Sequence, residues 1–303
     1  MSKELLKKVF TTAKECNEWS LQIIKISNSD YYCREIEFKE PGRIKKFVDE
    51  LADKYLSKNG IDSFDSVDDY TGDVVGHSIY RLNSDNTLIS TEFNQLIYRM
   101  SDPDTEGDVE TQKFQAYVIS GTLNLNDRPI PVKFFTMQTP LVNLTNKFVF
   151  SDGKYKEIDS RVLSLRRTTD VMIVNQTVYM LTLAGERLFS MERAYKTVCN
   201  EKVNDVILSG ILTNPETFEK VAKSGHNPRR FVSYNPDRLV ALSDAKTRKK
   251  LAEKFQIYLD ENNKIDTSDE KVSERLVKFL CNKGMLDPLN ALPVEVAAAK
   301  SWS

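Results

Sequence analysis

The feature that most constrains the fold of this sequence is a long stretch of short apolar runs separated by turn residues, between residues 113 and 183. The runs are Phe114–Ile119, Ile130–Met137, Lys147–Phe150, Tyr155–Ile158, Val162–Leu165, Val171–Val174 and Val178–Leu183. Asp152-Gly153 and Asn175-Gln176 suit hairpin connections, because glycine and short polar residues tolerate positive φ angles. Runs of this length between such turns predict an antiparallel β meander.

The residues before this stretch predict a mixture of helices and strands. A short helix is expected over residues 3–15, followed by a β-hairpin formed by Trp19–Ile26 and Tyr31–Phe38. Apolar residues at helical spacing predict two more helices, over residues 44–55 and 92–100. Two acidic loops flank the second of these: the first carries Asp62, Asp65, Asp68, Asp69 and Asp73, and the second runs from Asp102 to Glu110.

The residues after Ala184 are mainly helical in pattern. A long helix is predicted from a stripe formed by Met191, Tyr195, Cys199, Val203 and Val206. Later helix starts are indicated at Asn214-Pro215, Asn235-Pro236 and Ser243, because these residues favour the first helical turn. A short strand is expected at Gln256–Leu259 and a last helix over Asp269–Cys281.

These patterns together predict an α+β fold with an N-terminal α/β region, a central antiparallel β meander and a helix-rich C-terminal part. We expect two domains. The first covers residues 1–110 and carries the acidic loops. The second covers residues 111–303 and joins the meander (111–183) to a basic helical part (184–303).

Composition excludes several classes of protein. No apolar run approaches the ~18 residues of a membrane span, and the charged start MSKELLKKVF lacks the apolar centre of a signal peptide. We therefore expect a cytoplasmic protein. The four cysteines form no CxxC pair, and only His77 and His226 could supply imidazole. This inventory predicts no disulfide framework, no metal site, no cofactor and no readable catalytic centre.

Charge is unevenly distributed along the chain although the formal net charge is only −1. Residues 1–150 contain 18 lysines and arginines against 23 acidic residues, whereas residues 151–303 contain 25 against 21. Residues 221–254 alone contain nine basic and three acidic residues. Such a local excess of positive charge favours contact with a polyanion.

The helix expected over residues 244–255 has the most informative pattern in this basic region. At 100° per residue, its four lysines fall within an arc of about 140°; they are Lys246, Lys249, Lys250 and Lys254. Leu251, Ala252 and Phe255 occupy the opposite side, with Arg248 on that apolar flank. Such a helix can pack one side on a core and offer four ammonium groups to phosphates. The alternative is an ordinary solvated lysine face.

Three arginines upstream of this helix could extend the basic surface. They are Arg229, Arg230 and Arg238, and guanidinium groups suit bidentate contacts with phosphate. The sequence therefore predicts a nucleic-acid-binding set of these three arginines and the four lysines. Arg166 and Arg167, by contrast, are at least as well explained by structural pairing with Asp159 or Asp170, since adjacent strand residues point to opposite faces.

Two alternative sites remain open. Pro236-Asp237 followed by Asp244-Ala245-Lys246 resembles the PD…(D/E)xK pattern of metal-dependent nucleases, in which both carboxylates hold a metal ion and the lysine positions water. The spacing is short, however, and the second half opens a helix. The loop from Asp102 to Glu110 begins like a calcium loop, but Lys113 stands where the bidentate glutamate is required. A scaffold that binds another protein is a third functional alternative.

One segment of the meander and one segment of the tail resemble a known bacterial family. The first is Thr169-Asp-Val-Met-Ile-Val-Asn-Gln-Thr-Val-Tyr-Met-Leu181, in which an aspartate opens a short apolar strand and a tight turn leads to a second strand. The second runs from Phe279 through Met285-Leu-Asp-Pro-Leu-Asn-Ala-Leu-Pro to Glu295. Over residues 160–296 the chain resembles the KwaB family of the Kiwa anti-phage system. Gly185-Glu186-Arg187 departs from the Phe-Glu pair common in that family.

The resemblance implies a bacterial antiviral defence protein. It further implies a cytoplasmic, homodimeric DNA-binding protein that acts with a small membrane-embedded partner and could be recruited by that partner to the inner face of the membrane. No individual DNA contact is carried over from the family, so the seven predicted contact residues rest on charge alone.

Overall fold

The computed structural model describes residues 3–27, 30–38, 40, 42–72, 77–103, 114–138, 148–151, 154–157, 165–282, 284–286 and 293–295. The chain divides into two compact units. Unit 1 comprises residues 1–69 and 77–190, and unit 2 comprises residues 70–76 and 191–303. A short segment between two strands of unit 1 therefore belongs to unit 2. The division at residue 110 that the sequence suggests stays a prediction.

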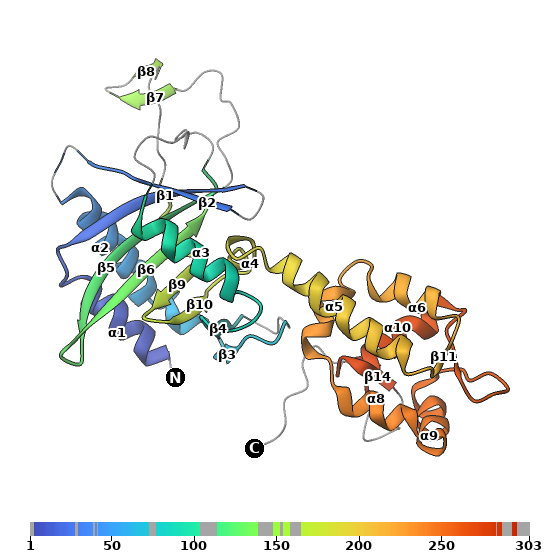
Figure 1. Cartoon of the computed structure of the whole chain (residues 1–303). Coiled ribbons are helices and arrows are strands. Elements are labelled where there is room, and N and C mark those ends of the chain that lie inside the picture. The colour runs from blue at the N-terminus through green and yellow to red at the C-terminus, as the bar shows by residue number, and fades with distance from the viewer. Residues whose placement is uncertain are drawn as a thin grey trace. The chain divides into compact units, whose positions relative to one another are not determined.

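Unit 1 is built on a sheet whose eight strands, within the described residues, lie in the order β2-β1-β5-β6-β9-β10-β4-β3 (Figure 1). Their bounds are β1 Trp19–Ser27, β2 Asp30–Glu35, β3 Val67–Asp69, β4 Ile79–Asn83, β5 Ala116–Leu125, β6 Arg128–Met137, β9 Val171–Val174 and β10 Thr177–Met180. Neighbouring strands are antiparallel except β3 and β4, which are parallel. β7 (Phe148–Ser151) and β8 (Lys154–Glu157) form a separate hairpin.

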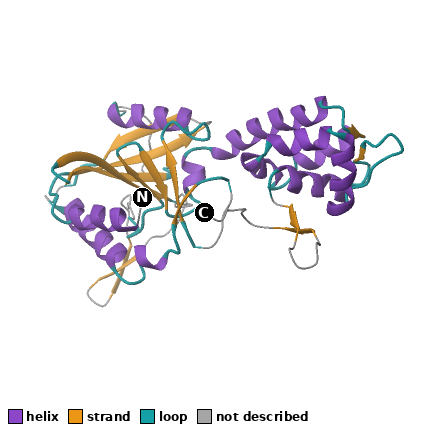
Figure 2. Cartoon of the chain, turned by 90° about the horizontal axis from the view of Figure 1, so that it is seen from below, coloured by secondary structure: helices purple, strands orange, loops and turns teal. Residues whose placement is uncertain are grey.

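Helices cover both faces of this sheet (Figure 2). Two of them, α1 (Lys3–Ala13) and α2 (Arg43–Leu56), bury their apolar sides against one face, where Phe10 stacks on Tyr55 and on Phe134 of β6. On the other face, α3 (Ser90–Ser101) packs against β2. A short helix, α4 (Gly185–Leu188), follows β10, and a 3₁₀ turn, η1, spans Ile61–Ser63. Because side chains alternate along a strand, each strand contributes to both apolar layers.

The predicted fold class is confirmed, and so are its main parts. The hairpin β1–β2 forms, and β5, β6, β9 and β10 are sheet neighbours in chain order. Asn175 makes the β9–β10 turn with a φ angle of 56°, as its residue type predicts. The strand expected at Val162–Leu165 and the Asp152-Gly153 turn lie outside the described residues, apart from Leu165. β3 and β4 were not predicted from the sequence, because neither carries the long apolar alternation that marks a strand.

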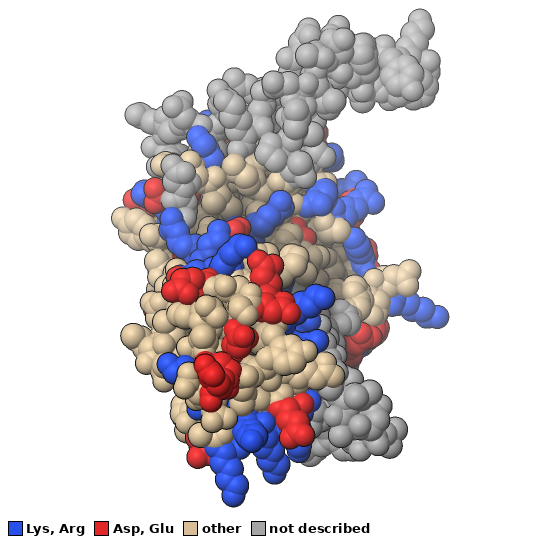
Figure 3. Space-filling model, turned by 90° about the vertical axis from the view of Figure 1, so that its right-hand side faces the viewer, with Lys and Arg blue, Asp and Glu red and all other residues tan. Residues whose placement is uncertain are grey.

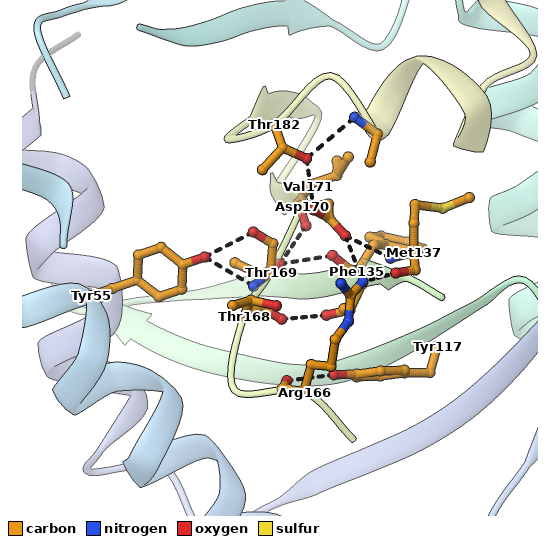
Figure 4. Close-up of polar contacts among 12 residues, drawn as sticks. Tyr55, Tyr117, Phe135, Met137, Arg166, Thr168, Thr169, Asp170, Val171 and Thr182 are labelled. Carbon is orange, nitrogen blue, oxygen red and sulfur yellow. Dashed lines mark hydrogen bonds and ion pairs between the residues drawn. The ribbon is translucent and has the colours of Figure 1, made fainter. Parts of the chain in front are cut away.

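A network of hydrogen bonds fixes the start of β9 (Figure 4). The hydroxyl of Tyr55 donates to the carbonyl of Thr169 at 2.9 Å and accepts from its amide at 3.0 Å. The buried carboxylate of Asp170 accepts from the amide of Met137 at 2.8 Å and from the hydroxyl of Thr182 at 2.6 Å. Arg166 pairs with Asp170 at 3.6 Å. The aspartate that opens the family-like motif thus ties β6, β9 and the turn after β10 together.

Unit 2 is a helical unit with a core of its own. Its helices are α5 Met191–Leu208, α6 Pro215–Ala222, α7 Asn227–Arg230, the 3₁₀ turn η2 Phe231–Ser233, α8 Pro236–Ser243, α9 Ala245–Phe255 and α10 Glu270–Leu280. Two short strand pairs accompany them: β11 (Leu212–Thr213) with β12 (Ile265–Asp266), which are parallel, and β13 (Gly284–Leu286) with β14 (Pro293–Glu295), which are antiparallel.

The structure corrects two details predicted for this region. The expected strand at Gln256–Leu259 is wrong, because Gln256 ends α9 in the left-handed conformation and only an isolated bridge joins Leu259 to Ile265. The helix start placed at Ser243 is one residue early, since Asp244 caps α9. The apolar run that follows α9 is too short for its pattern to distinguish a strand from an irregular segment.

Candidate nucleic-acid interface

The lysine-rich helix α9 is fixed at both ends by local chemistry. At its start the Asp244 carboxylate accepts a hydrogen bond from the amide of Thr247 at 2.7 Å. The hydrogen bonds with Thr247 hold the pKa of Asp244 below its ordinary value. The apolar side packs as predicted: Ala252 is buried, and the ring of Phe255 contacts that of Phe279 edge-on at 4.9 Å. One side of α9 is therefore anchored in the core of unit 2.

The four lysines of α9 are all exposed. Within the described part of the chain, none of Lys246, Lys249, Lys250 and Lys254 takes part in an ion pair or a hydrogen bond. Figure 3 shows cationic side chains projecting at the height at which α9 lies in Figure 1, with acidic side chains beside them. We refer to the side chains of Lys246, Lys249, Lys250 and Lys254 as the lysine face. Its ammonium groups are available to an anion without breaking a hydrogen bond or an ion pair among the described residues, although Lys246 lies close enough to Asp244 to help lower its pKa.

One acidic residue lies within the same arc of α9 as the four lysines. At 100° per residue, Glu253 falls between Lys246 and Lys249, and it is exposed. Its carboxylate forms no ion pair among the described residues. The lysine face therefore carries four positive charges and one negative charge, a fact that the helical positions alone could have revealed.

Arg248 of the same helix makes contacts that stabilise the fold. Its side chain is buried, with 8% exposed. The guanidinium donates to the carbonyl of Asn263 at 2.7 Å and to that of Leu242 at 2.6 Å, with a longer contact of 3.3 Å to Ser243. Two of these carbonyls belong to the last turn of α8, whose final carbonyl groups have no partner inside the helix. Arg248 therefore joins α8, α9 and the loop before β12.

The three upstream arginines have partners within unit 2. Arg229 donates to the carbonyl of Gly72 at 2.7 Å and to the hydroxyl of Tyr70 at 3.1 Å. Arg230 forms an ion pair with Glu274 on α10. Arg238 donates to the carbonyls of Phe279 and Gly284 and lies over the ring of Phe279 at 4.8 Å.

The environments of these arginines differ from that of the lysine face. Burial lowers the pKa of Arg238. Burial alone would raise the pKa of Glu274, but the hydrogen bonds from Asn227 and Arg230 outweigh it and lower that pKa. These guanidinium groups hold α7, α8 and α10 in place. The arginines therefore make contacts within unit 2, whereas the four lysines are exposed on one side of α9.

The residues of the nuclease-like pattern lie at two helix starts. Asp237 is in the first turn of α8 and is exposed, whereas Asp244 caps α9. No three His, Cys, Asp or Glu side chains come together as a metal-binding group in the described ranges. Asp244 already accepts the Thr247 hydrogen bond, and no strand carries the Asp244–Lys246 half of the pattern. The described residues thus contain no preformed metal site that would support the nuclease alternative.

The remaining candidates from the sequence are resolved in part. Arg166 pairs with Asp170 as predicted, and Arg167 pairs with Glu50 at 2.8 Å. In the first acidic loop, Asp62 pairs with Lys7 and Asp69 with Arg81. The calcium-like loop lies outside the described residues from Asp104 onward.

No helix within the described residues has the length and apolar character that crossing a membrane requires. Neither the curated proteins nor the solved structures contain a match to this chain. The model of a family described as Kiwa protein KwaB-like matches residues 112–286, a span that runs from the meander to β13 and includes α9. Because this match covers more than half of the 303 residues, the chain belongs to the KwaB-like family of the Kiwa anti-phage defence system.

Proposed function

We propose that this protein serves anti-phage defence by binding DNA through the lysine face of α9, with little preference for sequence. The observation that carries the proposal is that four exposed ammonium groups on one side of a docked helix form no hydrogen bond or ion pair within the described residues. Cations that neutralise phosphates release counterions, and this gain does not depend on the bases.

The length of the lysine face supports contact with a duplex backbone. Lys246 and Lys254 are eight residues apart, which corresponds to about 12 Å along a helix axis. One DNA strand places a phosphate about every 3.4 Å along the duplex axis, so this span covers three to four phosphates. A lysine ammonium on a flexible stem adapts to such a row without a fixed geometry. Arg229, Arg230 and Arg238 contribute to this proposal by holding the helices beneath the face.

Binding can be tested by fluorescence anisotropy with two labelled duplexes of equal length and unrelated sequence. We expect dissociation constants that agree within about threefold, because phosphate contacts carry no direct sequence information. A strong preference for one duplex, persisting when labels are exchanged, would contradict the proposed mode of contact. Absence of binding to either duplex at low salt would remove the DNA-binding function altogether.

Glu253→Gln should strengthen binding, because Glu253 is the one carboxylate within the arc of the lysine face. Removing a negative charge beside a bound phosphate lowers the repulsion at the surface, and we expect affinity to rise about threefold at low salt. Anisotropy titrations of the variant measure this. Glu192→Gln on α5, where the carboxylate pairs with Lys196 at 2.7 Å, is the matched control and should leave affinity unchanged.

The partner and the assembly state are part of the same proposal. We propose that a homodimer acts with a small membrane-embedded partner, which could recruit it to the inner face of the membrane, as family membership suggests. Such a complex should survive nuclease treatment and the loss of the lysine face if it forms through protein contacts. Co-purification of the two proteins before and after nuclease treatment tests this. Loss of the partner on nuclease treatment would show that DNA, rather than protein contact, joins them.

A further inference from the structure

Unit 1 contains two buried polar atoms without a hydrogen-bond partner and, beside them, a half-buried lysine without an ion pair, within the described residues. Among the described residues, the Oε1 atom of Gln22 and the Oγ atom of Ser120 are buried with no hydrogen-bond partner. Gln22 is only 8% exposed. Lys133 is half-buried, and within the described residues its ammonium forms no hydrogen bond or ion pair. Burying polar groups without partners is costly, and native proteins contain few of them.

These three side chains lie on the same face of the sheet. Leu21, Ile23, Ile119, Val132 and Phe134 belong to the core beneath α1 and α2. Because alternate residues of a strand point to opposite faces, the side chains between them point to the face that α3 covers. Gln22 confirms this placement, since its amide donates to the carbonyl of Met100 at the end of α3 at 3.0 Å.

The strand register makes the three groups neighbours. Ser120 of β5 is directly opposite Lys133 of β6, and Gln22 of β1 is opposite Val118 of β5. Directly opposed residues in an antiparallel pair have Cβ atoms about 4.5–5.5 Å apart, and diagonal neighbours such as Gln22 and Ser120 are about 7–8 Å apart. Gln22 and Lys133 lie on the two strands that flank β5, about 10 Å apart across the sheet, so a ligand placed over Ser120 lies between their side chains.

The unsatisfied groups define the chemistry of their missing partner. Lys133 can only donate hydrogen bonds and carries a positive charge, whereas Ser120 can donate or accept. The orientation of the Gln22 amide is fixed by the carbonyl of Met100, so its free Oε1 atom must accept. The complement is an anion with several acceptor oxygens and one hydrogen-bond donor. A carboxylate lacks the donor, and a phosphodiester lacks it as well. A phosphate that retains an ionisable hydroxyl has both.

An open groove reaches Ser120, the residue that lies between the other two. It has a volume of about 740 Å³ and is lined by Ser20, Ser120 and Thr122 together with the loop residues Cys16–Trp19 and Gly121. Ser120 therefore lies in the wall of the groove and opposite Lys133 at the same time. The hydroxyl groups of Ser20 and Thr122 are further donors within the same wall.

We propose that Gln22, Ser120 and Lys133 form a binding site for a terminal phosphate group, either free phosphate or the monoester of a small molecule. Lys133 and Ser120 donate to phosphate oxygens, and Gln22 accepts from the phosphate hydroxyl. The site belongs to unit 1, and α9 belongs to unit 2. It is therefore independent of the proposed contact with the DNA backbone.

Thermal unfolding of the full chain in phosphate and in sulfate tests the site. Trp302→Phe leaves Trp19, which lines the groove, as the one remaining tryptophan, so fluorescence reports unit 1. At equal ionic strength, phosphate at ten times its dissociation constant should raise the midpoint by about 3–6 °C. Sulfate, which carries no hydroxyl at neutral pH, should raise it less. Equal shifts in the two anions, or no shift in phosphate, would overturn the proposal.

Variants separate this site from other basic surfaces. Lys133→Met should abolish the phosphate-induced shift, and Ser120→Ala should reduce it. Replacing the four lysines of α9 with glutamine should leave the shift intact. If Lys133→Met keeps the shift, or the α9 variant loses it, the proposed site is wrong. Glycerol phosphate in place of inorganic phosphate then distinguishes the sources: a larger shift at equal concentration identifies a monoester, and a smaller one identifies free phosphate.

Lys133→Met should also be more stable than the parent protein when phosphate is absent. Burial, the sole cause of the shift, lowers the pKa of Lys133 from its ordinary value of 10.5. The unfolded chain therefore binds the Lys133 proton more tightly than the folded chain does. The resulting loss of folding stability is fully present at pH values below the folded-state pKa. The stability advantage of methionine should shrink as pH rises toward 10.5, because the unfolded lysine also loses its proton there. A variant less stable than the parent at neutral pH would assign Lys133 a structural role and overturn the proposal.

Discussion

Reversal of charge at Lys246, Lys249, Lys250 and Lys254 to glutamate is expected to abolish retention of DNA while the fold survives. The four side chains are exposed and make no described contact, so their replacement removes no packing. Four contacts with phosphate become four repulsions, and we expect affinity to fall by at least about 100-fold at low salt. A gel shift at low ionic strength measures the loss, and circular dichroism verifies the fold.

The dependence of DNA binding on salt concentration measures how many phosphates the lysine face neutralises. If each lysine neutralises one phosphate, the logarithm of the binding constant should fall with the logarithm of salt concentration with a slope of about −3.6. Each single lysine-to-glutamine change should flatten that slope by about 0.9. A slope near zero in the parent protein would mean that phosphates are not the ligands.

A matched control tests whether position or net charge matters. Lys196, Lys202 and Lys220 lie on other helices of unit 2, Lys223 directly follows α6, and each pairs with a carboxylate. Their reversal to glutamate changes the net charge of the chain by the same amount as reversal of the lysine face. Exposed ion pairs add little stability, so the fold should tolerate the change. DNA retention by this control, with loss in the α9 variant, assigns binding to the lysine face.

Arg248→Ala should destabilise unit 2 by about 3 kcal/mol, the largest effect on stability that we expect from one side chain in α9. The change leaves the buried carbonyl of Leu242 and the partly buried carbonyl of Asn263 without their charged donor. Urea unfolding followed by far-ultraviolet circular dichroism measures the loss. Arg193→Ala, at an exposed position on α5, is the matched control and should change stability by less than about 0.5 kcal/mol.

DNA binding separates the role of Arg248 from that of the lysines. Well below its unfolding midpoint, Arg248→Ala should still bind DNA with an affinity near that of the parent protein, because its guanidinium faces carbonyls and not solvent. A loss of binding without a loss of stability would place Arg248 in the interface itself and contradict the structural assignment.

Local patterns in the sequence predicted much of this molecule. Helical spacing of apolar residues located α2, α3 and α5, and the strand pairs β1–β2 and β9–β10 followed from short runs joined by turns. The lysine face also follows from local geometry, since a helix with one apolar side must turn its other side to solvent. The family-like motif beginning at Thr169 was recognisable without coordinates, and the family match to residues 112–286 confirms it.

Such local patterns did not predict which groups the charged side chains contact. Arg229, Arg230 and Lys246 look equivalent in a count of charge, yet Arg230 pairs with Glu274, which lies 44 residues away, whereas Lys246 is exposed. Arg229 contacts Gly72, which lies 157 residues away. Contacts over such separations depend on how whole elements pack, and no local period in the sequence records them.

The sequence by itself determined the α+β class, the order of most elements and the solvent-facing row of lysines, because each depends on the period of a single helix or strand. The tertiary structure alone decided which arginines hold the fold, how β3 and β4 join the sheet, and that Gln22, Ser120 and Lys133 share one face. The physical reason is that a side chain's burial and its partners are set by the surfaces that surround it, and those surfaces come from distant parts of the chain.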